Sequence, residues 1–210
     1  MEEVLKATIE NGLELPIMEQ FYTIQGEGSN AGMAAYFIRT GGCDVGCVWC
    51  DVKDSWDADA HPKFSVESIA EEAQTSLCPN VVITGGEPCM YNLGPLTDTL
   101  QKLGFNTWLE TSGAHPITGE WDWIVFSPKK FKAPLPEAYT KAHELKVVIA
   151  NKHDFKWAEQ HAQKVNGNAE LFLQVEWSRR DKLMPLIVDY VKAHPRWRIS
   201  TQSHKYISVP

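Results

Sequence analysis

Three cysteines lie close together in the sequence, with three residues between the first two and two residues between the last two. They are Cys43, Cys47 and Cys50. Thiolates at this spacing can meet at a soft metal centre, because sulfur ligands favour iron–sulfur clusters, zinc or Cu(I) over hard ions. A structural zinc ion and a ferredoxin-type cluster each take four protein ligands. Three cysteines are one ligand short, which favours a [4Fe-4S] cluster with one iron open to a small molecule.

The alternative is a zinc site or an iron–sulfur binding module without catalytic activity. Zinc would need a fourth ligand, and none of the nearby candidates, His61, Cys78 and Cys89, stands at zinc-finger spacing. Five cysteines are an odd number, so in a reducing compartment the clustered trio indicates a metal or redox site rather than disulfides. We expect Cys78 and Cys89 to be ordinary buried thiols.

Length, composition and charge limit the class of protein to which the chain can belong. They predict a single domain over residues 1–210. The net charge of −7 argues against sequence-independent binding of nucleic acid, because such binding needs clustered Lys and Arg side chains. No apolar run has the length of a membrane span, and the acidic start of the chain is unlike a signal peptide. We therefore expect a cytoplasmic protein that binds neither nucleic acid nor membranes.

Alternating strands and helices must position the cysteines. Helices are expected from a Ser65 cap to Leu77, over residues 93–103, from an Asp154 cap to residue 165, and over residues 183–193. No regular element is expected for residues 21–28, and residues 130–144 are expected to be loose. Apolar runs predict strands at residues 34–40, 81–84, 106–110, 123–126, 145–149 and 171–175, with a last candidate at 197–200.

This order of elements predicts a parallel sheet with right-handed crossovers. The chain is too short for the eight strand–helix units of a full barrel, so we expect an open, partial (β/α)6-type barrel of about six strands. Ligands bind at the carboxyl ends of strands in such folds. Arg39 ends the first of these strands, and taken alone it is expected to be a salt-bridge partner at the rim.

Several separate stretches together resemble the 7-carboxy-7-deazaguanine synthases of the radical S-adenosylmethionine (SAM) superfamily. The cysteine trio, with Trp49 before its last member, is typical of the superfamily, whereas Gln25-Gly26-Glu27-Gly28 is far more specific. The resemblance runs essentially end to end. Its stretches are residues 21–28, 37–43, 49–51, 84–88, 109–111, 127–129 and 203–206.

The resemblance implies a carbon–nitrogen lyase of the pathway that leads to queuosine and related 7-deazapurines. Members of the family contract the ring of 6-carboxy-5,6,7,8-tetrahydropterin to 7-carboxy-7-deazaguanine, release ammonia and regenerate SAM. The resemblance implies that Cys43, Cys47 and Cys50 hold a [4Fe-4S] cluster, whose electron cleaves SAM to a 5'-deoxyadenosyl radical. It also implies an electron donor such as flavodoxin or ferredoxin, and a homodimer.

By the same resemblance, two neighbouring binding sites are expected. The SAM site would use Glu87 to accept from the amino group of SAM, and the pterin site would pair Arg39 with the substrate carboxylate. The pterin site would comprise Ile24, Gln25, Gly26, Arg39, Thr84 and the terminal carboxylate of Pro210. The SAM site would comprise Trp49, Cys50, Asp51, Gly86, Glu87, Ser127, Pro128, Lys129, Leu173, Gln174, Val175 and Glu176.

The chain departs from the family pattern at two places. Family members commonly carry Thr or Ser after the Cys-Asp pair, where the hydroxyl helps to bind Mg2+, but this chain has Val52. Magnesium is expected only if Asp51, Asp54 or Ser55 supplies an oxygen ligand instead. The stretch 174–176 also replaces a more usual Gln-Pro. The enzymatic alternative is a different radical SAM enzyme, such as an activase that makes a glycyl radical on a partner protein.

Overall fold

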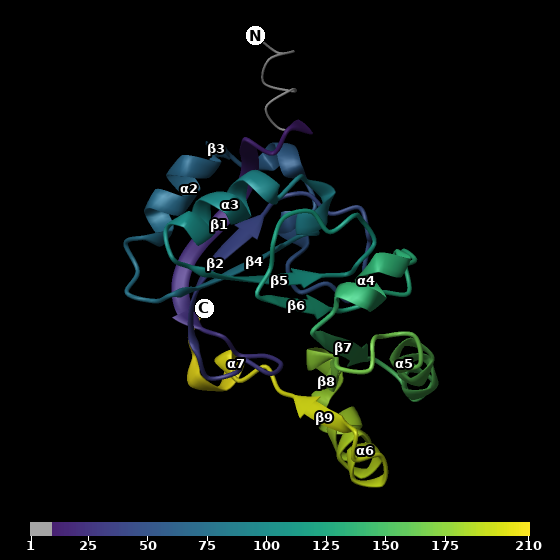
Figure 1. Ribbon diagram of the computed structural model, residues 1–210. Coiled ribbons are helices and arrows are strands. Elements are labelled where there is room, and N and C mark those ends of the chain that lie inside the picture. The colour runs from purple at the N-terminus through teal and green to yellow at the C-terminus, as the bar shows by residue number, and fades with distance from the viewer. Residues whose placement is uncertain (1–9) are drawn as a thin grey trace.

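The computed structural model describes residues 10–210, which form a curved nine-stranded sheet with helices along its outer side (Figure 1). The strand order is β3-β1-β2-β4-β5-β6-β7-β8-β9. The long strand β1 (Glu14–Ile24) pairs antiparallel with both β2 (Ala34–Thr40) and β3 (Lys63–Ser65). These pairs form one edge of the sheet, next to the parallel part.

From β2 to β9 every neighbouring pair of strands is parallel, and the two edge strands of the sheet do not meet. This confirms the predicted fold class, an open partial barrel. The remaining strands are β4 (Asn80–Gly85), β5 (Asn106–Thr111), β6 (Trp123–Phe126), β7 (Glu144–Ile149), β8 (Glu170–Val175) and β9 (Trp197–Ser200).

The helices α2 to α6 follow the outer, convex side of the sheet, whereas the short C-terminal helix α7, in yellow, lies near the end of β1 (Figure 1). Within residues 10–210, no helix has both the length and the apolar composition that crossing a bilayer requires. The helices are α2 (Val66–Ala73), α3 (Gly94–Lys102), α4 (Pro136–Lys141), α5 (Asp154–Ala162), α6 (Arg180–Ala193) and α7 (His204–Ile207).

Two segments that the sequence predicts to be irregular contain regular structure. Residues 21–24 belong to β1, because they pair with β2 and the rings of Phe21 and Phe37 stack with centroids 5.4 Å apart. Likewise α4 lies in the segment 130–144, and Pro136 occupies its first turn, where a missing N–H costs nothing.

Several predicted helix bounds are wrong. The helix α5 ends at Ala162 and not at residue 165, and α6 begins at Arg180 and not at residue 183. The Ser65 cap of α2 is confirmed by its bond from the Ser68 N–H, but the helix ends at Ala73 and Leu77 is 98% exposed. Hydroxyl groups after Ala73 bond back to backbone carbonyls and compete with the helical pattern. Asp154 begins α5 without capping it, because its carboxylate accepts from the preceding backbone N–H groups of Ala150 and Asn151.

The two faces of the sheet bury different kinds of side chain, because successive residues of a strand point to opposite faces. The convex face packs against the helices in one apolar core, which includes Ile83, Leu145 and Leu173. On the concave face the buried apolar cluster of Ala35, Val82 and Trp108 is small, and its members lie in the amino-terminal parts of their strands. Toward the carboxyl ends the concave face is therefore left to polar groups and a cavity.

Candidate active site

A cavity of ≈ 310 Å³ lies on the concave face at the carboxyl ends of the parallel strands. This volume is at the lower end of the range for small-molecule sites, about 300–1,000 Å³. The strands β2, β4, β5, β7 and β8 contribute to its wall, together with the cysteine loop (residues 42–51) and the C-terminal segment (residues 202–210). Stretches that are far apart in the sequence thus meet at one site.

The three cysteines of the loop are neighbours on the cavity wall. Cys47 is buried, Cys43 and Cys50 are half-buried, and all three are free thiols that pack with Val45 and Ala114. Burial raises the pKa of Cys47 to about 11, so this thiol keeps its proton at neutral pH unless a cation binds there.

These donors suit a cluster in which each iron takes one thiolate. Within residues 10–210, no group of three or more His, Cys, Asp and Glu side chains is arranged around a single metal ion. A cluster does not need such a group, because its cysteines bind different irons. The three adjacent thiols therefore fit the cluster that the sequence predicts.

Two glycines let the cysteine loop press against the end of β4. Gly42 adopts a φ of 96°, which other residues rarely adopt. A Cβ at Gly86 would lie 2.2 Å from the carbonyl oxygen of Gly42 and 2.8 Å from the Cβ of Cys43. The N–H of Glu87 also donates to the Gly42 carbonyl at 2.9 Å. Gly86, directly after β4, is therefore required by this close approach, beyond the needs of a simple turn.

A cluster of charged side chains ties the cysteine loop to the loops after β5 and β6. Oδ1 of Asp44 lies 2.9 Å from Nε2 of His115, and Oδ2 of Asp44 lies 2.5 Å from Nζ of Lys132. The two nitrogen atoms are 3.0 Å apart. Although partial burial acts against it, bonding to His115 and Lys132 lowers the pKa of Asp44. These contacts hold the loop that carries Cys43 and Cys47 in place from outside the cavity.

The carboxylate of Glu87 is buried and already bonded within the protein. It accepts from the Thr111 hydroxyl at 2.5 Å, from the N–H groups of Ser112 at 2.8 Å and Cys89 at 3.2 Å, and from the Ser112 hydroxyl. A carboxylate offers about four lone-pair sites, so these donors fill it. To accept from the amino group of SAM, as the sequence predicts, Glu87 would have to exchange one of these partners.

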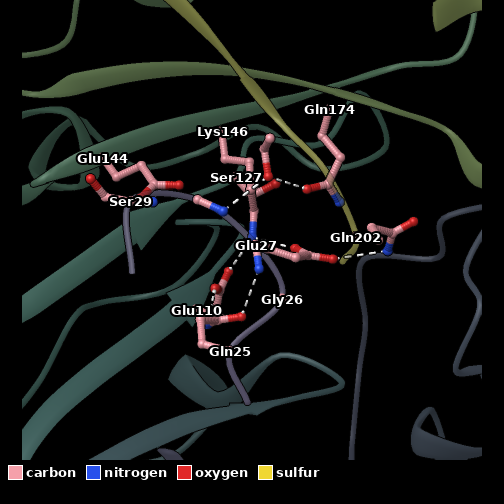
Figure 2. A network of polar contacts seen from close by, with 12 residues as sticks. Gln25, Gly26, Glu27, Ser29, Glu110, Ser127, Glu144, Lys146, Gln174 and Gln202 are labelled. Atoms are coloured by element: carbon pink, nitrogen blue, oxygen red, sulfur yellow. Dashed lines mark hydrogen bonds and ion pairs between the residues drawn. The ribbon is translucent and has the colours of Figure 1, made fainter. Parts of the chain in front are cut away.

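A buried lysine and two carboxylates form the floor of the cavity (Figure 2). Lys146 is 3% exposed and donates to Glu27 at 2.6 Å and to Glu110 at 2.8 Å. Burial acts to raise the pKa of Glu27, but Lys146 and a bond from Gln202 outweigh it and lower this pKa to about 2. Burial, together with the charge of Glu27, raises the pKa of Glu110, which also accepts from Gln25 at 3.5 Å.

The loop between β1 and β2 is fixed to the far side of the barrel (Figure 2). The N–H of Ser29 donates to the buried carboxylate of Glu144 at 3.0 Å, and the N–H of Gly28 donates to the Ser200 hydroxyl at 3.0 Å. The other oxygen of Glu144 has no hydrogen-bond partner among the described residues. Burial, with a further contribution from the charge of Glu110, raises the pKa of Glu144 to about 7, although Lys146 acts against this.

All six residues predicted for the pterin pocket line the first cavity. Arg39 uses Nε to bond Glu19 at 2.6 Å, so the predicted rim salt bridge exists and the side chain still faces the cavity. Gln25 is buried, and its amide oxygen accepts from the N–H of Glu27 at 3.0 Å. An oxygen of Pro210 accepts from the Thr23 hydroxyl at 3.3 Å, which holds the chain end at this site.

The residues predicted for SAM binding divide between this cavity and a second cavity of ≈ 690 Å³ beside it. Pro128 lines only the second cavity, and Leu173 lines neither, because its side chain packs in the convex core. Lys129 donates to the Ser127 hydroxyl at 2.5 Å, and its ammonium lies 5.6 Å from the centre of the Trp49 ring. The other predicted residues, Cys50, Asp51, Gly86, Glu87, Gln174, Val175 and Glu176, all line the first cavity.

Sequence reasoning missed Lys146 and most of the C-terminal segment. Lys146 is the second residue of the apolar strand predicted at residues 145–149, and the one charge in that run was the available signal. The family resemblance includes His204 in the stretch 203–206 without giving it a role, and no local pattern marks Gln202. A Cβ at Gly26 would lie 2.1 Å from Nδ1 of His204, so the glycine of the predicted stretch makes room for this ring.

Comparisons with known proteins agree with this arrangement. Residues 37–124 match the radical SAM superfamily. The chain is 55% identical over 206 residues to the 7-carboxy-7-deazaguanine synthase of Flavobacterium psychrophilum, with 98% of each chain covered. It is 47% identical to the protein of the same name from Synechocystis sp., with 92% of this chain and 93% of the relative covered. The crystal structure of QueE from Escherichia coli is similar with a TM-score of 0.83 at 32% identity, covering 93% of this chain and 96% of that chain.

Proposed function

Because the chain belongs to the 7-carboxy-7-deazaguanine synthases of the radical SAM superfamily, we propose that it converts 6-carboxy-5,6,7,8-tetrahydropterin into 7-carboxy-7-deazaguanine and ammonia. The observation that supports this most directly is that one cavity is lined both by the cysteine trio and by residues such as Gln25, Arg39 and Thr84. A cofactor held by the cysteines and a substrate held by the other residues would be in contact, as chemistry between them requires.

We propose that Cys43, Cys47 and Cys50 hold a [4Fe-4S] cluster and that SAM binds beside it. When bound, these cofactors supply the radical chemistry, and the protein supplies binding and orientation. The glycine at position 86 offers backbone groups at the end of β4, and Ser127 and Lys129 face the same space. The aromatic side chains around the second cavity, among them Trp49 and Trp177, would exclude water from the bound cofactor.

For the substrate, we propose that Arg39 binds the carboxylate. Its Nε is already bonded to Glu19, which orients the guanidinium and leaves its two terminal nitrogens for a bidentate contact. Gln25 and the backbone groups of Gly26 would meet the amide and guanidine-like edge of the pterin, together with the carboxylate of Pro210. The ionised Glu27 and Lys146 below them keep the floor of the cavity polar and fixed.

The proposed function is tested by anaerobic incubation of the cluster-reconstituted, chemically reduced protein with SAM and 6-carboxytetrahydropterin. The expected product is 7-carboxy-7-deazaguanine, identified by mass spectrometry, in amounts that exceed the SAM consumed because SAM is regenerated. Formation of 5'-deoxyadenosine without any deazapurine would instead favour another radical SAM enzyme, such as a glycyl-radical activase. A bound metal whose spectrum does not respond to added SAM would favour a binding module.

We further propose that the protein works in the cytoplasm, where reducing conditions keep clustered thiols free to bind a cluster. An electron donor such as flavodoxin or ferredoxin would supply the reducing equivalent. We also propose a homodimer, in which a second subunit covers part of the open side of the barrel. Sedimentation of the reconstituted protein checks the last point, because a monomer at all concentrations would contradict it.

A further inference from the structure

Lys205 lies where the C-terminal segment meets the cysteine loop. Its ammonium nitrogen is 3.1 Å from Oδ2 of Asp51, 3.1 Å from Oε1 of Gln202 and 5.0 Å from the centre of the Trp177 ring. Asp51 and Gln202 line the first cavity, and Lys205 lines the second. The ammonium group therefore stands at the boundary between the two cavities, beside the cysteine loop.

The position of this ammonium group is fixed by the buried floor of the site. Nε2 of Gln202 donates to Glu27 at 2.8 Å, and Glu27 is in turn held by Lys146 at 2.6 Å. Since Gln202 is buried, its amide oxygen is oriented toward Lys205 by this bond. An ammonium group has three N–H donors, and Asp51 and Gln202 take two of them. One donor remains for an oxygen atom of a bound ligand.

The same surroundings do not suit a divalent ion. Mg2+ requires oxygen ligands in an octahedral arrangement. Val52 offers no oxygen, and Ser55 is buried with its hydroxyl donating to the Val52 carbonyl at 2.6 Å. Neither Ser55 nor Asp54 lines either cavity. Asp51 does line both, but a divalent ion beside its carboxylate would face the positive charge of Lys205.

We propose that the ammonium group of Lys205 is the cation that pairs with Asp51 in the working enzyme, where a divalent metal ion would otherwise bind. On the function proposed above, on which this inference rests, it binds an oxygen atom of the pterin substrate, and turnover requires no divalent metal ion. Lys205 is thus assigned as a substrate-binding residue that takes over the position where a divalent cation would otherwise be needed.

The test uses the cluster-reconstituted protein with SAM and 6-carboxytetrahydropterin, without reductant for binding and with reductant for turnover. Electron paramagnetic resonance of added Mn2+ measures divalent-ion binding to the wild-type protein, and turnover is compared before and after removal of divalent ions with a chelator. Substrate affinity is compared between the wild type, Lys205→Met and Lys205→Arg. Lys164→Met is the matched control, because Lys164 also lies over an aromatic ring, Tyr139 at 5.7 Å, but lines neither cavity.

The expected result is that Mn2+ stays free in solution and that chelation leaves the turnover rate within about twofold. Lys205→Met should weaken substrate binding by about tenfold or more, the cost of losing a bond from a charged donor, while Lys205→Arg and Lys164→Met bind nearly as the wild type does. One tightly bound Mn2+ per chain, or turnover lost on chelation and restored by Mg2+, would overturn the proposal. So would a Lys205→Met variant with wild-type substrate affinity.

Failure of this inference is distinguishable from failure of the proposed function. If the wild-type protein forms the deazapurine only with Mg2+ present, the function stands and the role of Lys205 falls. If no deazapurine forms with or without Mg2+, the function falls. The Mn2+ signal of the wild-type protein also keeps the inference open to refutation should Lys205→Met fail to hold its cluster.

Discussion

Replacing the buried lysine of the cavity floor by methionine should destabilise the protein strongly. The side chain of Lys146 is 4% exposed, and it is the cation that offsets the charges of Glu27 and Glu110. Lys146→Met keeps the length of the side chain but leaves two buried carboxylates facing each other. Removing one partner from a buried ion pair costs about 3–5 kcal/mol. That is a large part of a typical stability of about 5–15 kcal/mol.

The loss should also depend on pH, with a sign that follows from the same contacts. In the wild type Lys146 helps to lower the pKa of Glu27 to about 2, so this carboxylate stabilises the fold above its ordinary pKa and loses that contribution only in acid. Without Lys146, burial raises the pKa of both carboxylates, and one of them must take up a proton on folding. The variant should therefore lose more stability at alkaline pH than at mildly acidic pH.

Urea denaturation under anaerobic conditions, followed by tryptophan fluorescence, measures this change in the free energy of unfolding. The matched control is Lys141→Met, which removes a surface ion pair with Glu137 at 3.0 Å and should cost about 0–1 kcal/mol. A charge-balanced variant, Lys146→Met with Glu27→Gln and Glu110→Gln, should recover more than half of the loss. If Lys146→Met and Lys141→Met lie within about 1 kcal/mol of each other, Lys146 is not the buried counter-ion described here.

Three further predictions concern the cluster, the chain end and the buried acid. Cys47→Ala should abolish SAM cleavage, whereas Cys78→Ala, a change at a buried thiol outside the loop, should leave it intact; activity in Cys47→Ala would reject the assigned ligand set. A tag added after Pro210 should raise the KM for the pterin much more than an N-terminal tag of equal length, and equal KM values would remove the chain end from the site. Because the pKa of Glu144 is raised to about 7 in the fold, its contribution to stability is complete below its ordinary pKa of 4.5 and is lost as the pH rises through about 7. Urea unfolding should show that the free energy of unfolding of the wild type falls by about 3 kcal/mol across this pH range, as the size of the pKa shift requires. This fall should be absent in Glu144→Gln. An equal dependence of the free energy of unfolding on pH in the two proteins would refute the prediction.

Much of the fold follows from local patterns in the sequence. The strands β2 and β4 to β9 are short apolar runs, most of them separated by helices, so both their existence and their parallel order were predictable. The short edge strand β3 was not predicted, because its residues are mostly exposed and show no apolar run. The strand β1 escaped prediction because its burial depends on β2, whose residue Phe37 stacks on Phe21. The end of α2 depends on hydroxyl groups that compete with the helix, a balance that apolar spacing at Leu77 does not report.

The site was predictable only where its residues share a motif or stand at the end of a strand. Arg39 and Thr84 end neighbouring parallel strands and pair in register, so the topology alone brings them to one edge. Lys146 and Glu27 are 119 positions apart, and Lys205 and Asp51 are 154 positions apart. Such contacts depend on how the loops and the chain end cross the open barrel, which no local pattern encodes.

The openness of the barrel explains why its interior can be charged. A closed barrel fills its centre with layers of branched apolar side chains from its own strands. Here a small apolar cluster around Trp108 fills only the amino-terminal part of the concave face. The gap that a closed barrel would lack admits Glu27 from the loop after β1 and Gln202 from the C-terminal segment. Glu27 accepts from both Lys146 and Gln202, and Gln202 in turn orients Lys205 at the boundary between the two cavities. The incomplete barrel is therefore what allows a polar floor beneath the cysteine loop.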